Sequence, residues 1–223
     1  MSLPKVSVQL PCGYGNEFVE TAIDCYVDQK YAGETELILL DNNTTPLLWA
    51  ADLPFVSYYR CKRMPLGALR NLANSYAMGD IIIHFDEDDW SHPDRIATQV
   101  DRLLTTGKAV TGFHSFLFYS VVDGGTYRYH YSDRSHEPYG SGATLAYTRE
   151  WWVKHPFVET GIEDRPFTDA ALATGQLDSC DGGQLLVCRV HGHNLVQKQL
   201  GHRQFPAVDR STFPPEFFPQ QSL

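Results

Sequence analysis

The sequence predicts an α/β domain built on a mostly parallel central sheet. Over the first hundred residues, short apolar stretches alternate with segments of helical spacing, and this order is typical of βαβ units. A second observation is the run of four acids at 86–89, directly after the apolar stretch 81–85. Because buried carboxylates need partners, these acids must lie at the carboxyl end of a strand, where open α/β sheets bind ligands. At 223 residues, the chain has the length of one well-packed domain.

Four strands and three helices are expected in the first half of the chain. The strands are short apolar stretches that end at polar or turn-forming residues, at 6–11, 36–40, 55–60 and 81–85. The helices repeat apolar residues every three or four positions, at 17–29, 65–78 and 93–105. Gly79 ends the second helix, and Ser91 or His92 caps the third, with Pro93 at its first position.

The second half is richer in strands. We expect strands at 110–122 and 127–131 around the turn Asp123-Gly124-Gly125, then a polar loop at 132–141 and a strand at 143–147. Helices are expected near 149–154 and at 169–174, and a late apolar strand at 185–190. The tail after Phe205 contains four prolines. It is therefore expected to form an irregular arm that lies over the domain or over a neighbour.

Composition and charge narrow the class of protein. The formal net charge is −9 at pH 7 and 43% of the residues are hydrophobic, as in soluble globular proteins. The acidic balance argues against binding to nucleic acid or to anionic membranes. No apolar run approaches the ~20 residues of a membrane span, and the first residues do not resemble a signal peptide. The five cysteines are dispersed, so we expect reduced thiols in a cytoplasmic protein and no zinc site.

The acidic run at 86–89 has two interpretations. Oxygen ligands gathered at one point suit Mg²⁺ or Mn²⁺, and such ions are usually shared with a phosphate group. Alternatively, the acids form only a loop before a helix and interact favourably with the helix dipole. The residues by themselves leave both interpretations open.

Several motifs occur in order along the chain: a first strand that ends in Pro11, Asp41-Asn42-Asn43, an Arg70-Asn71 helix, the acids at 86–89, Glu163-Asp164, and His191-Gly192-His193-Asn194. In this order the chain resembles the family 2 glycosyltransferases, which have the GT-A fold, over about residues 6–196. The resemblance implies one GT-A, Rossmann-like domain over 1–223. It would comprise a nucleotide-binding half at about 4–106, an acceptor half at about 107–204 and a C-terminal arm at 205–223.

The resemblance implies a nucleoside-diphosphate sugar donor, expected to be a UDP-sugar, and Mn²⁺ or Mg²⁺ as cofactor. Asp88 is the first choice as metal ligand, because a divalent cation would carry the charge that grows on the leaving diphosphate. Asp86 is expected at the donor ribose and near the metal. His191 is expected to reach the metal or the pyrophosphate; His193 competes for this role, and a loop histidine without a ligand is the alternative. The other expected donor-binding residues are Pro11, Tyr14, Asp41 and Arg70.

Transfer with inversion needs a base that takes the proton of the acceptor hydroxyl. By family position Asp164 is the expected base, and Glu163 is expected to bind an acceptor hydroxyl beside it. Trp90 is the expected platform for the acceptor sugar, because an aromatic face can cover the apolar side of a pyranose.

Each of these assignments has a structural alternative. Glu163 and Asp164 could simply cap the following helix. Asp41 could end its strand in an Asx-turn, without touching a ligand. Arg70 could be a surface cation of its helix, and Trp90, like most aromatic residues, could belong to the core.

The function expected from the sequence is a metal-dependent, inverting glycosyltransferase that moves a sugar from a nucleoside-diphosphate sugar to the hydroxyl of an unknown acceptor. A sugar nucleotidyltransferase is one alternative, but that chemistry typically needs basic residues in the first glycine loop, and 12–16 contain none. A catalytically inactive GT-A domain that binds a sugar or a partner is another. The presence of Asp88 and Asp164 argues against it.

Overall fold

The computed structural model describes residues 2–13, 17–131, 138–159, 162–194 and 198–218. In the first half the elements are β1 (Val6–Cys12), α1 (Val19–Val27), β2 (Thr35–Asp41), α2 (Leu48–Ala51), β3 (Val56–Arg60), α3 (Leu66–Tyr76), β4 (Ile81–His84), β5 (Trp90–Ser91) and α4 (Arg95–Thr106). The second half comprises β6 (Val110–Ser120), β7 (Thr126–His130), η1 (Gly142–Thr144), β8 (Ala146–Thr148), α5 (Arg149–Lys154), α6 (Asp164–Ala173), β9 (Leu177–Asp181), β10 (Leu186–Val190), η2 (Arg210–Thr212) and η3 (Pro215–Phe217).

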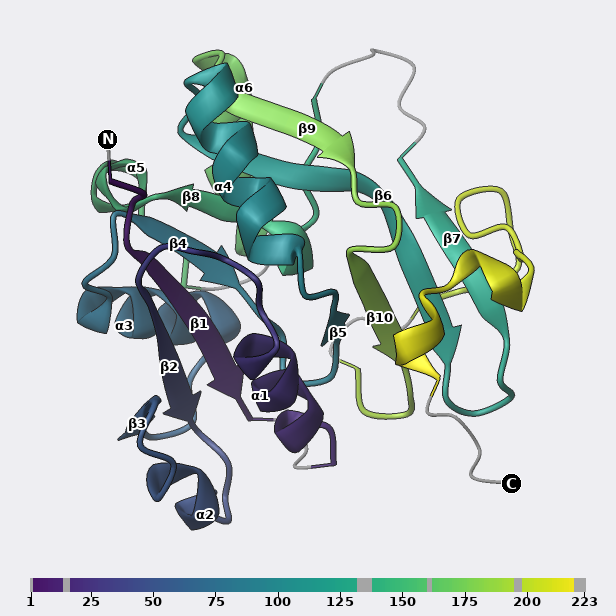
Figure 1. The fold of residues 1–223 in the computed structure, drawn as a ribbon, viewed down its shortest axis with the longest axis horizontal. Coiled ribbons are helices and arrows are strands. Elements are labelled where there is room, and N and C mark those ends of the chain that lie inside the picture. Colours follow the sequence, from purple (N-terminus) through teal and green to yellow (C-terminus); the bar gives the residue numbers. More distant parts are fainter. Residues whose placement is uncertain (1, 14–16, 132–137, 160–161, 195–197, 219–223) are drawn as a thin grey trace.

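The described strands form one sheet in the order β3-β2-β1-β4-β8-β6-β10-β5, and β7 and β9 also pair with β6. Strands β3, β2, β1 and β4 are parallel, while β8 runs antiparallel between β4 and β6. The carboxyl ends of β1, β2 and β4 therefore meet at one edge of the sheet (Figure 1). The expected α/β architecture with a mostly parallel sheet is confirmed, and the acids at 86–89 follow β4 at this edge.

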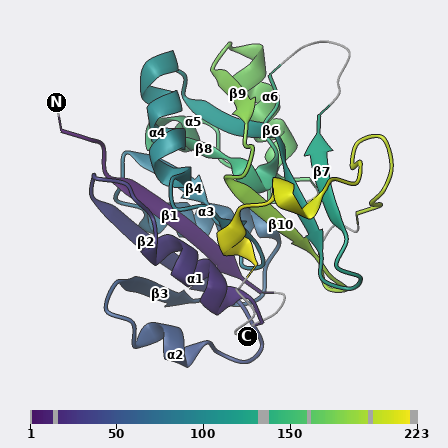
Figure 2. The ribbon, with the colours of Figure 1, turned by 45° about the vertical axis from the view of Figure 1, so that its right-hand side comes forward.

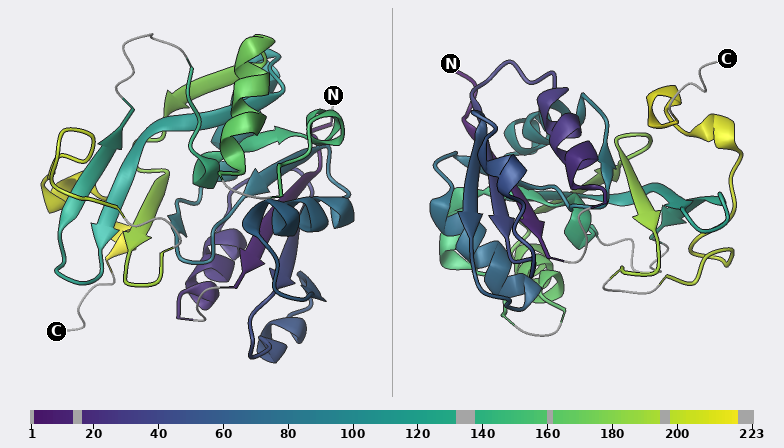
Figure 3. Two further views of the ribbon diagram at one scale, coloured as in Figure 1. Left: turned by 180° about the vertical axis from the view of Figure 1, so that it is seen from behind. Right: turned by 90° about the horizontal axis from the view of Figure 1, so that it is seen from below.

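Helices cover both faces of the parallel half of the sheet. Helices α1 and α4 lie on one face, and α3, α5 and α6 lie on the other, as the front and rear views show (Figures 1 and 3). Strand β2 alternates between the two cores that result: Leu37 and Leu39 pack with α1, whereas Ile38 and Leu40 pack with α3. The alternation follows from the period of two of a strand buried on both faces. None of the helices in the described part of the chain is long and apolar enough to cross a bilayer.

Strand β9 is not predicted from the sequence. Two aspartates within five residues disfavour a strand by composition, but each has an arginine partner from another element. Arg102 of α4 lies 2.9 Å from the Asp178 carboxylate, and Arg128 of β7 lies 2.7 Å from the Asp181 carboxylate. These ion pairs make an aspartate-rich strand compatible with its place beside β6.

Helix α6 begins at Asp164, well before the expected 169–174. Pro166 suggests a break in the sequence, but proline is compatible with the first turn of a helix because the amides there have no intrahelical partner. The short helix α2 is also not expected from the sequence. It has only four residues, which is too few to show a helical repeat of apolar positions. Conversely, the strand expected at 110–122 ends at Ser120.

The C-terminal segment lies against the strand-rich half, beside β7 and β10 (Figure 2). Two backbone amides of β7 donate to carbonyls of this segment. Arg128 donates to Pro206 and His130 donates to Gln204, each at a distance of 3.1 Å. Phe213 and Phe217 are buried in the same core as α1 and α4. The segment therefore completes the core of this chain rather than extending away from it.

Arg95, the first residue of α4, is fully buried. Its Nη2 donates to the carbonyls of His84 (2.7 Å) and Ala143 (2.8 Å), and its Nη1 donates to the Ser91 hydroxyl (2.7 Å). Burial lowers the pKa of Arg95 to about 10, so the guanidinium stays charged at neutral pH. Arg95 thereby joins the end of β4 to η1, directly behind the acidic run.

Replacing Arg95 with methionine should lower the free energy of unfolding by about 3–5 kcal/mol, because two buried carbonyls would lose their donor. Urea denaturation followed by circular dichroism measures the change. Arg165→Met, whose side chain is 77% exposed, is the control and should alter stability by no more than about 0.5 kcal/mol. Equal losses in the two variants would contradict the role assigned to Arg95.

Candidate active site

A pocket of about 550 Å³ lies where the carboxyl ends of β1 and β4 approach the start of α6. Residues from well-separated parts of the sequence line it, including Pro11, Arg70, Asp86, Asp88, Glu163 and Asp164. The structure therefore brings together six of the residues that the sequence analysis selected. Tyr14, another expected donor-binding residue, lies outside the described residues.

The first two acids of the run point to different elements. Asp86 Oδ1 lies 3.3 Å from Arg70 Nη2, which comes from α3. Both oxygens of Glu87 accept the backbone amide of Gly13, at 3.1 and 3.2 Å, and so hold the loop after β1. Separate partners let adjacent carboxylates stay close together in a site where like charges would otherwise repel.

Asp88 points to the segment after β10. Its Oδ2 lies 2.9 Å from His191 Nε2 and accepts a hydrogen bond from Asn194 Nδ2 at 2.9 Å. Burial raises the pKa of Asp88, and the charge of Asp86 raises it further, while His191 lowers it. A partly buried carboxylate beside a second negative charge would gain from a cation, and carboxylate oxygen with imidazole nitrogen is a donor set that Mn²⁺ accepts.

Asp88 and His191 by themselves are an incomplete metal site. Within the described parts of the chain, no three His, Cys, Asp or Glu side chains are grouped so as to hold one ion. Asp86, an expected contributor, is engaged by Arg70 instead. Mg²⁺ and Mn²⁺ are commonly held by one or two protein ligands, with water and substrate phosphates in the remaining positions, so the Asp88–His191 pair fits an ion shared with a phosphate ligand.

Asn194 sets the conformation of the loop that carries His191. Its Oδ1 accepts the His191 amide at 2.6 Å, and its Nδ2 donates to the Arg189 carbonyl at 3.0 Å. This is the side-chain-to-backbone bonding expected of an asparagine in a tight turn. His193 lines the pocket, whereas His191 does not, and the His193 amide donates to His191 Nδ1 at 3.2 Å. His191, not His193, is the histidine in contact with Asp88.

Asp89 is buried and bonds to β10. It accepts the Arg189 amide at 3.2 Å and the Cys188 thiol at 2.9 Å. Burial, together with the charges of Asp88 and Asp86, raises the pKa of Asp89 well above its usual value. Asp89 therefore fixes the position of β10, and with it the loop that carries His191.

Arg70 links the two groups of acids. It is 2% exposed and is not the surface cation that a helical arginine usually is. Besides Asp86, its Nε lies 3.5 Å from Glu163 Oε1, and its Nη1 donates to the Gly142 carbonyl at 3.1 Å. His84 also contacts Nη1. One guanidinium thus spans from the end of β4 to the start of α6.

Glu163 and Asp164 do more than begin α6. Glu163 occupies the N-cap position, but its side chain makes no capping hydrogen bond and approaches Arg70 instead. Burial raises the pKa of Glu163, while Arg70 opposes the change. The Asp164 carboxylate lies against Gly142: a Cβ atom there would come within 2.5 Å of Asp164 Oδ2. Gly142 is therefore needed for the position of Asp164.

Trp90 does not lie in the pocket, and the expectation that it forms the acceptor platform is corrected. It is 8% exposed and packs in the core, with its ring 5.9 Å from that of Phe217. Phe217 belongs to the C-terminal segment, which covers this part of the domain. The indole is consequently part of the core, where one of its neighbours comes from more than a hundred positions away in the sequence.

Asp41 is fully buried, and its oxygens are occupied by groups of the chain itself. Oδ1 accepts from the Asn43 amide (2.9 Å), and Oδ2 accepts from the Leu47 amide (2.9 Å), Tyr58 (2.6 Å) and Arg60 (3.0 Å). Burial alone would raise the pKa of Asp41, but the hydrogen bonds from Tyr58, Leu47 and Asn43 outweigh it and lower the pKa. This geometry is that of the Asx-turn alternative.

The family model described as Glycosyl transferase family 2 matches residues 7–161, well over half of the chain. The chain belongs to glycosyltransferase family 2. The matched stretch of this family 2 domain ends just before Glu163 and Asp164. None of the curated proteins compared with the chain matches it.

Solved structures show the same fold. Residues 1–349 of TarS from S. aureus are similar at a TM-score of 0.65 and 16% identity, with 83% of this chain and 60% of that chain covered. The same fragment in complex with UDP-GlcNAc gives a TM-score of 0.67 at 16% identity over 85% of this chain and 60% of that one. The mannosyltransferase PcManGT from Pyrobaculum calidifontis, in complex with GDP-Man and Mn²⁺, gives 0.64 at 17% identity, over 85% and 59%. The family 2 domain thus spans about 60% of their length, and the expected GT-A fold is confirmed.

Asp41→Asn should lower the free energy of unfolding at pH 7 by about 2–4 kcal/mol, because charged hydrogen bonds are lost in a buried site. The folded pKa of Asp41 is below its unfolded value of about 3.9. The contribution of the Asp41 carboxylate to the free energy of unfolding is therefore present above pH ~4 and is lost as the pH falls through the folded pKa. Urea denaturation is measured at several pH values between 7 and 3. The difference in the free energy of unfolding between wild type and Asp41→Asn should become smaller as the pH falls. The exposed Asp52→Asn is the control, and a difference independent of pH would contradict the assignment.

Proposed function

We propose that this chain is a metal-dependent, inverting glycosyltransferase that uses a nucleoside-diphosphate sugar. One observation carries the proposal: a single pocket is lined by Asp88, which His191 contacts at 2.9 Å, and by the Glu163–Asp164 pair, with Arg70 connecting the two sides. The first pair is suited to a cation and a diphosphate, and the second is suited to accept a proton. A transferase needs both functions next to one reacting carbon.

The donor end of the pocket is formed by the strand ends. Asp88 and His191 would hold Mn²⁺ or Mg²⁺, and a bound divalent cation supplies stabilisation of the negative charge on the leaving diphosphate. Asp86 and Arg70 lie beside this pair, where hydrogen bonds to ribose hydroxyls or phosphate oxygens are available, and Pro11 lines the same wall. Asp41, expected from the sequence to contact the donor, is not part of this end, because its oxygens already accept hydrogen bonds from Asn43, Leu47, Tyr58 and Arg60.

The acceptor end is formed by the start of α6. Asp164 is proposed to take the proton of the acceptor hydroxyl as its oxygen bonds to the anomeric carbon and the bond from that carbon to the diphosphate oxygen breaks. Attack from the side opposite the leaving group inverts the configuration. Glu163, held near Arg70, is proposed to accept a hydrogen bond from a second acceptor hydroxyl.

Structural relatives support the choice of donor. TarS has been solved with UDP and with UDP-GlcNAc, and PcManGT with GDP-Man and Mn²⁺. Two different bases therefore occur among ligands of similar folds. We propose a UDP-sugar as the donor of this chain, and direct comparison of UDP with GDP in the binding experiment below tests that choice.

Asp88→Asn and His191→Ala should each weaken the Mn²⁺-dependent binding of UDP. The reason is that each removes one of the two protein ligands proposed for the ion, while the fold does not depend on either partly exposed side chain. Calorimetric titration with UDP, with and without Mn²⁺, measures the effect, and thermal unfolding checks the fold.

His193→Ala is the matched control, because His193 lines the same pocket without contacting Asp88. It should keep most of the Mn²⁺-dependent gain in affinity. If His193→Ala loses this gain and His191→Ala keeps it, the assignment of the histidine is wrong. If Asp88→Asn binds UDP with its full dependence on metal, the proposed metal site is wrong.

Asp164→Asn should keep metal-dependent UDP binding and lose transfer by roughly 10²–10⁴-fold, because an amide cannot accept the acceptor proton. Asp169→Asn is the control, since Asp169 is an exposed acid of the same helix, its side chain 64% accessible. Product anomers assigned by NMR should show inversion. A product with retained configuration, or near-normal turnover of Asp164→Asn, would contradict the mechanism, and wild type that binds UDP without any transfer would favour an inactive binding domain.

A further inference from the structure

The pocket has an aromatic wall beside Asp164 that the sequence analysis did not identify. Phe116 and Phe118 project from β6, and Tyr139 precedes η1; all three line the pocket together with Ala143. Phe116 and Phe118 are almost completely buried, whereas Tyr139 is only half-buried. Tyr139 is therefore the least buried of the three aromatic residues of this wall.

Tyr139 is held in place from several sides. Its ring stacks on Tyr131, with centroids 3.9 Å apart and an interplanar angle of 8°. Its carbonyl accepts the Ser179 hydroxyl at 2.7 Å. The next residue, Gly140, approaches Gly112 of β6 so closely that a Cβ on Gly112 would lie 2.6 Å from the Gly140 Cα. Two glycines thus bring the backbone at Tyr139 onto the sheet, and the ring is preorganised.

Tyr139 lies within electrostatic reach of the proposed base. Burial raises the pKa of Tyr139, and the negative charge of Asp164 also contributes to the increase. Three residues further along, Gly142 packs directly against the Asp164 carboxylate. The ring of Tyr139 and the Asp164 carboxylate therefore border the same part of the pocket.

The side chains of this wall indicate which kind of acceptor suits it. Residues 138–144 contain no lysine or arginine, and Phe116 and Phe118 add only apolar surface. Glu163 and Asp164 supply carboxylates beside the wall, and the cations Arg70, Arg189 and Lys198 line the same pocket, with Arg70 lying 3.5 Å from Glu163. A ring with C–H groups on one face and hydroxyls at its edge matches an aromatic face next to two acceptors of hydrogen bonds.

We propose that Tyr139 forms the acceptor subsite of this pocket and that the acceptor is a pyranose, stacked on the Tyr139 ring with a hydroxyl directed at Asp164. The inference rests on the proposed transferase function and adds the chemical class of the acceptor. It also assigns to Tyr139 the platform role that was expected of Trp90.

The test uses saturation-transfer NMR with methyl α- and β-pyranosides of glucose, galactose, mannose and N-acetylglucosamine. The full chain is measured with UDP and Mg²⁺, because Mn²⁺ would broaden the ligand signals. At least one glycoside should bind wild type, with the strongest transfer to the protons of one ring face.

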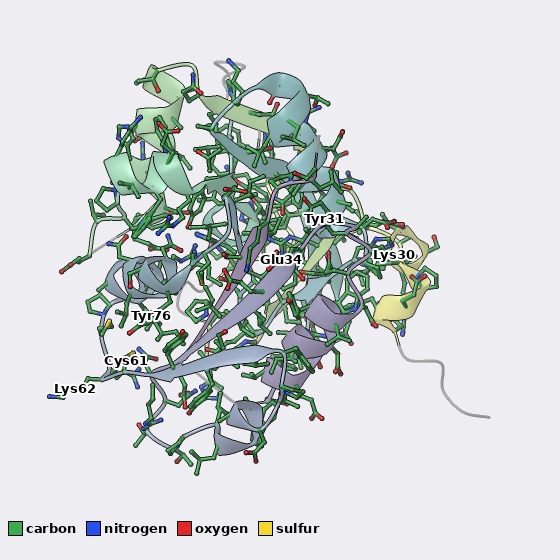
Figure 4. The ribbon with its side chains drawn as sticks, turned by 60° about the vertical axis from the view of Figure 1, so that its left-hand side comes forward. Lys30, Tyr31, Glu34, Cys61, Lys62 and Tyr76 are labelled. Carbon is green, nitrogen blue, oxygen red and sulfur yellow. The ribbon has the colours of Figure 1, made fainter. Side chains whose placement is uncertain are left out.

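Tyr139→Ala should weaken the affinity for this glycoside by about 3- to 10-fold, whereas Tyr139→Phe should retain the affinity. Tyr76→Ala is the matched control, because Tyr76 also stacks on a tyrosine, Tyr59, at 3.9 Å, but lies at the β3 edge near Cys61 (Figure 4).

UDP affinity, measured in the same samples, separates the two proposals. Loss of metal-dependent UDP binding in the wild type would count against the proposed function itself. Normal UDP binding without binding of any glycoside would overturn the acceptor class and leave the proposed function standing. Citronellyl phosphate, a lipid phosphate, is measured as the charged comparison. If it binds more tightly than every glycoside, the acceptor class is overturned and the proposed function stands. Equal glycoside affinity in wild type and Tyr139→Ala would overturn the assignment of Tyr139.

Discussion

Four consecutive carboxylates at the end of β4 impose the constraint on which the rest of the site depends. Adjacent acids repel one another and are costly to desolvate, so each must find its own partner. Asp86 meets Arg70 of α3, Glu87 holds the loop after β1, Asp88 meets His191, and Asp89 bonds to the backbone of β10. The partners come from α3, from the loop after β1, and from β10 with the residue that follows it. The acidic run therefore organises the surrounding elements while it supplies the candidate metal ligand.

The two halves of the pocket are joined by groups that lie behind its surface. Arg70 reaches Glu163 and the Gly142 carbonyl, and Arg95 of α4 binds the Ala143 carbonyl of η1. Both arginines are buried, so they couple the position of η1 to the end of β4. Because η1 borders Asp164 and follows Tyr139, the geometry proposed for the acceptor end depends on the same strand that carries the acids.

Local pattern accounts for most of the fold in the first hundred residues, where strands and helices alternate with clear apolar periods. It fails where tertiary partners compensate for an unfavourable composition, as in β9 with its two paired aspartates. The Asp88–His191 contact was within reach of the sequence, since both residues follow apolar strands and such ends meet at one edge of a sheet. Trp90 was not, because whether an aromatic ring faces a pocket or the core depends on what covers it, here Phe217.

The sequence by itself determined the α/β class and the position of the acidic run at a strand end, and it offered Asp88 and His191 as candidates because both follow apolar strands. These follow from periodicity and from residue types at strand ends, which are local properties. The Glu163–Asp164 pair was expected only from the resemblance to the family 2 glycosyltransferases. Only the tertiary structure decided that Asp41 is saturated by its own chain, that Arg70 is buried between two groups of acids, and that Tyr139 lies beside Asp164. Such facts depend on contacts between residues far apart in sequence, and no local pattern contains them.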